Sequence, residues 1–158
     1  MVKWDDVRED FEPDGSLRDI YVVSANPVVW DRALEFLLQA GNARYSIDDA
    51  AAVLPASAAE ALRVWPDRAP LLIIDREGIE YACHFFTPDR VELDFWPEDV
   101  RGPEEFAALT HFVVGLGRVT NRIVLVTYET SEAAEIFHYV PETDATEAGP
   151  LASRRTRG

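Results

Sequence analysis

The chain has 158 residues, 47% of them hydrophobic, and a formal net charge of -14 that results from 15 basic and 29 acidic side chains. This length fits a single domain, and the acidic balance argues against non-specific binding to nucleic acid or to an anionic membrane surface. A single cysteine excludes an internal disulfide framework and a metal site made from several cysteines.

The start of the chain, Met1 to Asp6, leads into an acidic stretch, which is the opposite of a secretory signal peptide. No segment approaches the roughly 18 consecutive apolar residues that are needed to span a bilayer. We therefore expect a cytoplasmic protein that makes no membrane contact.

The first predicted elements are a strand and a helix. The triplet Asp14-Gly15-Ser16 indicates a turn, and Leu17 to Ser24 has the β-branched and aromatic residues of a strand. Asn26-Pro27 is typical of an N-cap followed by proline in the first helical position. Apolar residues at helical spacing then predict a helix over about 27–40.

The next segment, residues 43–54, allows two interpretations. Either two strands, 43–47 and 50–54, are joined by a turn, or the second half begins a helix. Ser57 to Glu60 matches a capping box, in which the hydroxyl accepts a backbone N–H and the glutamate reaches back. This pattern predicts a short helix that proline stops at Pro66.

The centre of the chain predicts a meander of three strands, which are Leu71 to Asp75, Ile79 to Phe86 and Arg90 to Trp96. In the third strand the apolar side chains alternate with polar ones, so they point to opposite faces. One face of the sheet is therefore expected to be wet, as in an antiparallel sheet that is covered on one side. The apolar set is Val91, Leu93 and Phe95, and the other set is Glu92, Asp94 and Trp96.

The last third of the chain predicts one long helix and two further strands. The helix begins at Pro103, carries two glutamates in its first turn and has Gly117 as a candidate cap. The strands are predicted over 122–129 and 136–140.

Together these elements predict an α+β domain. Its single, largely antiparallel sheet has about six or seven strands, with two or three helices packed on one face. We expect the domain to span residues 1–141. Residues 142–158 have one large aliphatic side chain and no aromatic, so we expect a disordered tail there.

The neighbouring pair Cys83-His84 has the residue types of a nucleophile and a base. A strand turns adjacent side chains to opposite faces, so we expect Cys83 to be a packed hydrophobe and His84 to lie on the wet face. His84, His111 and His138 lie on separate elements, and convergence on a zinc ion is the alternative reading. No HExxH, dinucleotide-binding or P-loop motif is present. We therefore predict no catalytic residue, no metal ligand and no cofactor.

The candidate binding surface is an acidic run that contains an aromatic residue. Glu92 and Asp94 share one strand face, at a spacing that also suits paired carboxylates for glycoside hydrolysis or a hard cation. A run of carboxylates around a tryptophan is the composition expected of a surface that meets Arg and Lys on a partner. The predicted partner-binding residues are His84, Glu92, Asp94, Trp96, Glu98 and Asp99.

Three segments carry a resemblance to a known class of protein: FEPDGSLRDIYV (Phe11 to Val22), CHFF (Cys83 to Phe86) and VELDFWP (Val91 to Pro97). They resemble segments of small acidic bacterial proteins of the toxin-immunity type. The resemblance covers about the first two-thirds of the chain, and its motifs are structural and transfer no functional residue. It implies a single α+β domain that binds and blocks a cognate toxin.

The leading hypothesis is therefore a non-catalytic, immunity-type inhibitor that binds a basic partner protein such as a toxin, without contacting nucleic acid directly. The second hypothesis is an enzyme or small-molecule-binding protein with a pocket between the sheet and the helices. The third is a structural or adaptor subunit. The chain is expected to be a monomer or a homodimer joined through the outer face of the sheet.

Overall fold

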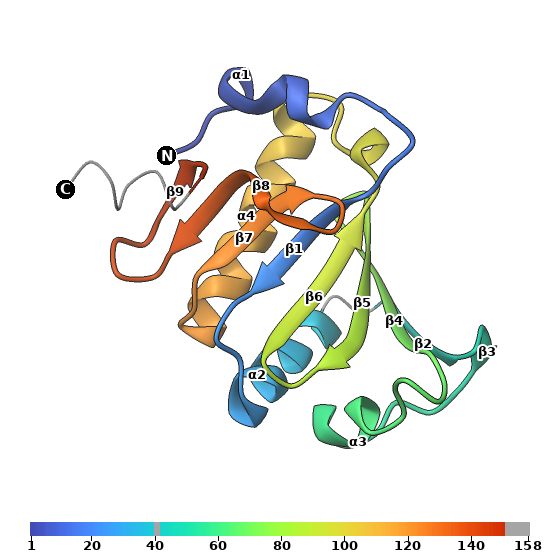
Figure 1. Cartoon of the computed structure of the whole chain (residues 1–158). Coiled ribbons are helices and arrows are strands. Elements are labelled where there is room, and N and C mark those ends of the chain that lie inside the picture. The colour runs from blue at the N-terminus through green and yellow to red at the C-terminus, as the bar shows by residue number, and fades with distance from the viewer. Residues whose placement is uncertain (40–41, 151–158) are drawn as a thin grey trace.

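The computed structural model describes residues 1–39 and 42–150 and shows an α+β fold with one antiparallel sheet (Figure 1). The strands are β1 (Arg18–Val22), β2 (Ala43–Ile47), β3 (Ala50–Ala51), β4 (Pro70–Arg76), β5 (Ile79–Thr87), β6 (Arg90–Phe95), β7 (Val124–Tyr128), β8 (Ser131–Val140) and β9 (Ala145–Ala148). The helices are α1 (Trp4–Val7), α2 (Pro27–Leu38), α3 (Ala58–Leu62) and α4 (Pro103–Thr120), with 3-10 turns η1 (Arg8–Phe11) and η2 (Pro97–Asp99).

The sheet has nine strands over the described residues, in the order β3-β2-β4-β5-β6-β1-β7-β8-β9. The α+β class and the antiparallel sheet are confirmed, whereas the prediction of six or seven strands is wrong. The described chain also has four α-helices rather than two or three, because the four-residue α1 is too short to show a periodic pattern. Residues 43–54 form two strands, β2 and β3, joined through Asp48 and Asp49 in left-handed conformations.

The strand β9 lies inside the stretch that was predicted to be a disordered tail. It pairs with β8, and its Thr146 is buried and accepts a hydrogen bond from the backbone N–H of Val2 at 3.2 Å. Composition misses this strand because its attachment is made by backbone groups and a hydroxyl, not by large apolar side chains. The tail prediction is therefore wrong for residues 145–148, and residues 151–158 lie outside the described residues.

Two helices, α2 and α4, lie behind the sheet in the view of Figure 1 and cover one face of it. Val91, Leu93 and Phe95 of β6 point to this side and are buried, as their alternation predicted. Aromatic rings fill the layer between helices and sheet: Tyr81 stacks on Phe112 of α4 with 3.9 Å between ring centroids. The space in which the second hypothesis placed a ligand pocket is thus occupied by core side chains at this position.

The helix α4 extends three residues beyond its predicted cap at Gly117 and ends at Thr120, and the C-cap residue Asn121 has a left-handed backbone with φ 52°. Gly117 has a different role. A Cβ atom there would collide with the ring of Tyr139 on β8, so glycine allows the helix to approach the sheet closely.

The arginine at the start of β1 holds the N-terminal segment in place. Arg18 is buried, and its guanidinium donates hydrogen bonds to the carbonyl oxygens of Asp10 (2.8 Å) and Glu12 (3.3 Å) and to the carboxylate of Asp14 (3.2 Å). Hydrogen bonds from Ser16 and from Arg18 lower the pKa of Asp14. The motif singled out in Phe11 to Val22 therefore has a structural purpose, which is to fasten η1 and the following loop to the sheet.

Candidate functional site

The outer face of the sheet, which is the face turned away from α2 and α4, gathers titratable side chains from three adjacent strands. His84 of β5 pairs in register with Glu92 of β6, which pairs with Tyr21 of β1. In the neighbouring row, Asp94 pairs with Asp19. Because paired residues on adjacent strands share one face about 5 Å apart, these five side chains form one group, named here the sheet-face cluster.

Asp19 is the most deeply placed carboxylate of the sheet-face cluster, with 5% of its surface exposed. Its Oδ2 atom accepts hydrogen bonds from the Tyr21 hydroxyl (2.8 Å) and from the backbone N–H of Thr130 (2.7 Å). Burial nevertheless raises the pKa of Asp19, since desolvation outweighs both hydrogen bonds. The fold therefore holds a carboxylate in a place where its charge is unfavourable.

His84 and Asp94 form the closest pair of the cluster, with 2.7 Å between Nε2 and Oδ2. Burial disfavours the charged imidazole, but the hydrogen bond to Asp94 and the charges of Asp94 and Glu92 outweigh it and raise the pKa of His84. The ring is therefore biased towards its cationic form, and it offsets part of the negative charge around it.

Glu92 lies between His84 and Tyr21 and is also shielded from solvent. Burial raises the pKa of Glu92, although Arg90, at 3.8 Å, favours the charged form. The Arg90 guanidinium lies 4.4 Å above the ring of Tyr21 and forms an ion pair with Glu132. Arg90 is thus shared between two carboxylates and a ring, and it neutralises the cluster only in part.

Exposed aromatic side chains border the cluster. Phe86 is 39% exposed and stacks on the His84 ring at 4.9 Å, and Trp65 lies 4.6 Å from Phe86. Trp96 follows the last residue of β6 and is 47% exposed. Rings of this kind give a partner apolar contact area beside the carboxylates.

The structure brings three of the six predicted partner-binding residues together, namely His84, Glu92 and Asp94, and Trp96 continues from the same strand. The other two diverge from them. Glu98 lies in η2 and contributes to a separate hollow, and the Asp99 carboxylate accepts a hydrogen bond from the backbone N–H of Glu80 at 3.4 Å.

Two members of the sheet-face cluster, Asp19 and Tyr21, were not predicted. Both belong to β1, which is buried along its whole length because it lies between β6 and β7. The signal was present in the sequence, since Asp19 and Tyr21 are two residues apart in a strand and alternate with the apolar Ile20 and Val22. The strand order that places them beside Glu92 and Asp94 required the structure.

Cys83 lies on the opposite side of the sheet from His84, as strand alternation predicted. It is fully buried, and burial raises the pKa of its thiol, so it is not an activated nucleophile.

His138 is buried between Glu135, 3.2 Å from Nδ1, and Glu147, 3.4 Å from Nε2. The three histidines lie on β5, α4 and β8, and no group of three or more His, Cys, Asp or Glu suited to a metal ion occurs in residues 1–39 and 42–150.

The sheet-face cluster can therefore accept a cation more readily than it can carry out covalent chemistry. Shielded carboxylates with exposed rings beside them suit the guanidinium of arginine or the ammonium of lysine.

Within the part of the chain that the structure describes, no helix combines the length and apolar character needed to cross a bilayer. Comparisons with protein-family models, with curated proteins and with solved structures each found no match to the chain.

Proposed function

We propose that this chain is a non-catalytic binding protein whose partner is a basic protein, and that the pair is of the toxin-immunity type which the sequence resemblance implies. The observation that carries the proposal is the sheet-face cluster. Asp19, Glu92 and Asp94 lie on adjacent positions of the outer sheet face, largely shielded from solvent, and exposed rings border them.

The electrostatics of the cluster support a cationic partner group. The pKa values of Asp19 and Glu92 are raised because the carboxylates are desolvated. A guanidinium or ammonium group placed over them would supply the charge and the hydrogen bonds that burial has removed. Each carboxylate would then be stabilised in its ionised form, so that binding and ionisation would favour one another.

The net charge of -14 supports the same conclusion at longer range. A strongly acidic body attracts a basic protein from a distance and raises the association rate, and salt screens this attraction. The partner that we propose is therefore one whose binding surface is rich in Arg and Lys, and the compartment that we propose is the cytoplasm.

The proposal is tested first by capture. The tagged protein is incubated with lysate of its source organism at low and at moderate salt, and the retained proteins are identified by mass spectrometry. We expect one stoichiometric basic protein whose recovery falls as salt rises. Recovery of no such protein at either salt concentration would contradict the proposal.

The second test assigns the surface. The variant Glu92→Gln/Asp94→Asn removes two charges from the sheet-face cluster, and Glu35→Gln/Glu60→Gln removes two exposed charges from α2 and α3. We expect the first pair to slow association with the purified partner about threefold to tenfold more than the second pair. Equal rates for the two variants, measured by surface plasmon resonance, would exclude the cluster as the binding surface.

A further inference from the structure

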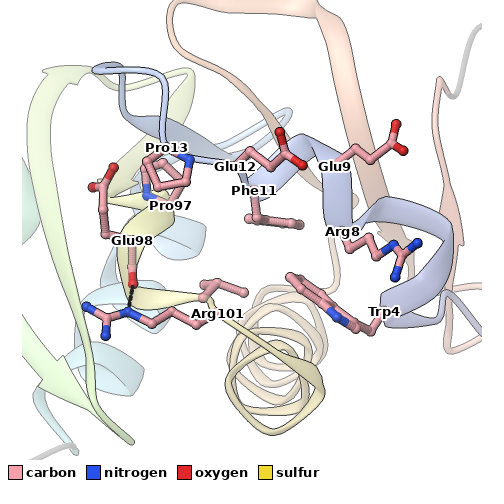
Figure 2. Close-up of a pocket in the computed structure, with 10 residues that line it drawn as sticks. Trp4, Arg8, Glu9, Phe11, Glu12, Pro13, Pro97, Glu98 and Arg101 are labelled. Atoms are coloured by element: carbon pink, nitrogen blue, oxygen red, sulfur yellow. Dashed lines mark hydrogen bonds between the residues drawn. The ribbon is translucent and has the colours of Figure 1, made fainter.

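A hollow separate from the sheet-face cluster lies at the end of the molecule where α1, η1 and η2 meet (Figure 2). Its volume is about 670 Å³, which is within the size range of ligand and peptide sites. We name it the end groove. It is lined by Trp4, Arg8, Glu9, Phe11, Glu12, Pro13, Pro97, Glu98, Val100 and Arg101.

One wall of the end groove is aromatic and is supported by the core. Trp4 and Phe11 lie 5.9 Å apart across one side of it, and each packs against Phe106 of α4. Figure 2 shows these two rings bordering the hollow, while Glu9 and Glu12 point away from it towards solvent. The hydrogen bonds of Arg18 to the carbonyls of Asp10 and Glu12 fix the backbone of this wall. The groove is thus formed before any partner arrives, which lowers the entropic cost of binding.

The charge around the groove is strongly negative. Residues 3–14 and 97–105 contain ten Asp and Glu side chains against three Lys and Arg. The lining itself holds three glutamates and two arginines, and the Nε of Arg101 donates a hydrogen bond to the carbonyl oxygen of Glu98 at 2.8 Å (Figure 2). A segment that enters the groove therefore meets an aromatic wall inside a border of mixed charge, at an end of the molecule that is negative overall.

We propose that the end groove binds an extended segment of the basic partner, with an apolar side chain against the partly exposed ring of Trp4 and flanking Lys or Arg side chains beside Glu9, Glu12 and Glu98 at the rim. This inference rests on the proposed function for the basic character of the partner. It adds a second contact surface. It also gives the type of partner sequence that this surface would bind, which is an apolar residue between cationic ones.

The test uses a defined peptide and the full chain. The ¹⁵N-labelled protein is titrated with acetyl-Lys-Leu-Arg-Leu-Lys-amide, and the charge-reversed acetyl-Glu-Leu-Glu-Leu-Glu-amide serves as the control. We expect chemical-shift changes at the Trp4 indole N–H and at the amides of Phe11 and Val100 with the basic peptide only. Changes of equal size with the acidic peptide, or no change at these groups up to several millimolar, would overturn the inference.

Two matched variants separate the groove from the general charge of this end. Glu9→Gln/Glu12→Gln removes two charges at the groove, and Glu104→Gln/Glu105→Gln removes two at the start of α4, outside its lining. We expect the first to weaken peptide binding about threefold relative to the second. Equal weakening would reduce the groove to a non-specific electrostatic contact and so overturn the inference.

The same spectra distinguish this inference from the proposed function. Shifts confined to His84, Glu92 and their neighbours on the outer sheet face would overturn the groove as a docking site and leave the sheet-face cluster as the place where the partner binds. The proposed function is tested separately, by the capture of a basic protein from lysate and by the association rate of the Glu92→Gln/Asp94→Asn variant.

Discussion

The two faces of the sheet are built from the same strands and have opposite chemistry. On the helix side, Cys83 and Leu93 are fully buried hydrophobes. On the outer side, one residue further along each strand, His84 and Asp94 form a hydrogen-bonded ion pair. The first face stabilises the fold by removing apolar surface from water, and the second retains desolvated carboxylates that lower stability. This contrast supports the proposal that the outer face binds a partner.

The largest expected effect comes from breaking the helix side. Phe112→Ala removes a buried ring from the stack with Tyr81 and should lower the free energy of unfolding by about 3–5 kcal/mol. Phe86→Ala on the outer face is the matched control, since it removes the same side chain where it is 39% exposed. The control should lose about 1 kcal/mol or less in urea unfolding. Similar losses would show that the two faces contribute equally to stability.

The next largest effect is expected from Arg18, which fastens the N-terminal segment to the sheet. Arg18→Met keeps most of the side-chain volume but leaves the carbonyls of Asp10 and Glu12 without their donor. We expect a loss of about 2–4 kcal/mol, because buried polar groups would be left unpaired. Arg122→Met is the control, since Arg122 is partly exposed and also donates to carbonyls, at Ser24 and Asn121. A smaller loss for Arg18→Met than for Arg122→Met would contradict the role given to Arg18.

A smaller effect, of about 1 kcal/mol or less, is expected from Glu92→Gln, and it depends on pH. Because burial raises the pKa of Glu92 in the folded state, its contribution to stability is fully present below the unfolded pKa and is lost as pH rises through the folded pKa. The variant should therefore gain stability over the wild type between about pH 4 and pH 7. The measurement is urea unfolding at about pH 4 and about pH 7. Glu60→Gln, on the exposed side of α3, is the control at both pH values. If the stability of the variant relative to the wild type fell as pH rises, the raised pKa of Glu92 would be contradicted.

The smallest change is spectroscopic. The pKa of His84 should lie above its ordinary value of about 6.5, and Asp94→Asn should lower it because the hydrogen bond and the nearest charge that oppose burial are removed. The stability that His84 contributes is present at low pH and is lost as pH rises through its folded pKa. The measurement is an NMR titration of the imidazole signals in the wild type and in the variant. An unchanged His84 titration in the variant would remove Asp94 as the cause.

The sequence allowed much of the fold to be predicted. Alternation in β6 and the Asn26 cap of α2 were correct, and Asn26 accepts a hydrogen bond from the backbone N–H of Val29 at 2.9 Å. The errors occurred where an element is held by contacts of its backbone with another segment of the chain. β9 attaches through its ladder with β8, and Gly117 serves a contact with Tyr139 that is remote in sequence. Neither feature has a local signature.

The relative placement of the candidate residues was predictable for neighbours in the chain and not for neighbours in space. Glu92 and Asp94 were grouped because they share a strand face, and that grouping holds. Glu98 and Asp99 were grouped with them by proximity in sequence, but η2 turns the chain and sends them elsewhere. Asp19 entered the cluster only because β1 is inserted between β6 and β7, which is a property of the topology.

The attachment of the N-terminal segment by Arg18 has a consequence for how this surface can change over evolution. Arg18 binds the carbonyl oxygens of Asp10 and Glu12, and every amino acid presents a carbonyl oxygen. The side chains of Glu9, Glu12 and Pro13 can thus be exchanged without losing these two attachments. A protein that must follow a changing partner would benefit from such a design, in which the anchor does not depend on the identity of the residues that face outward.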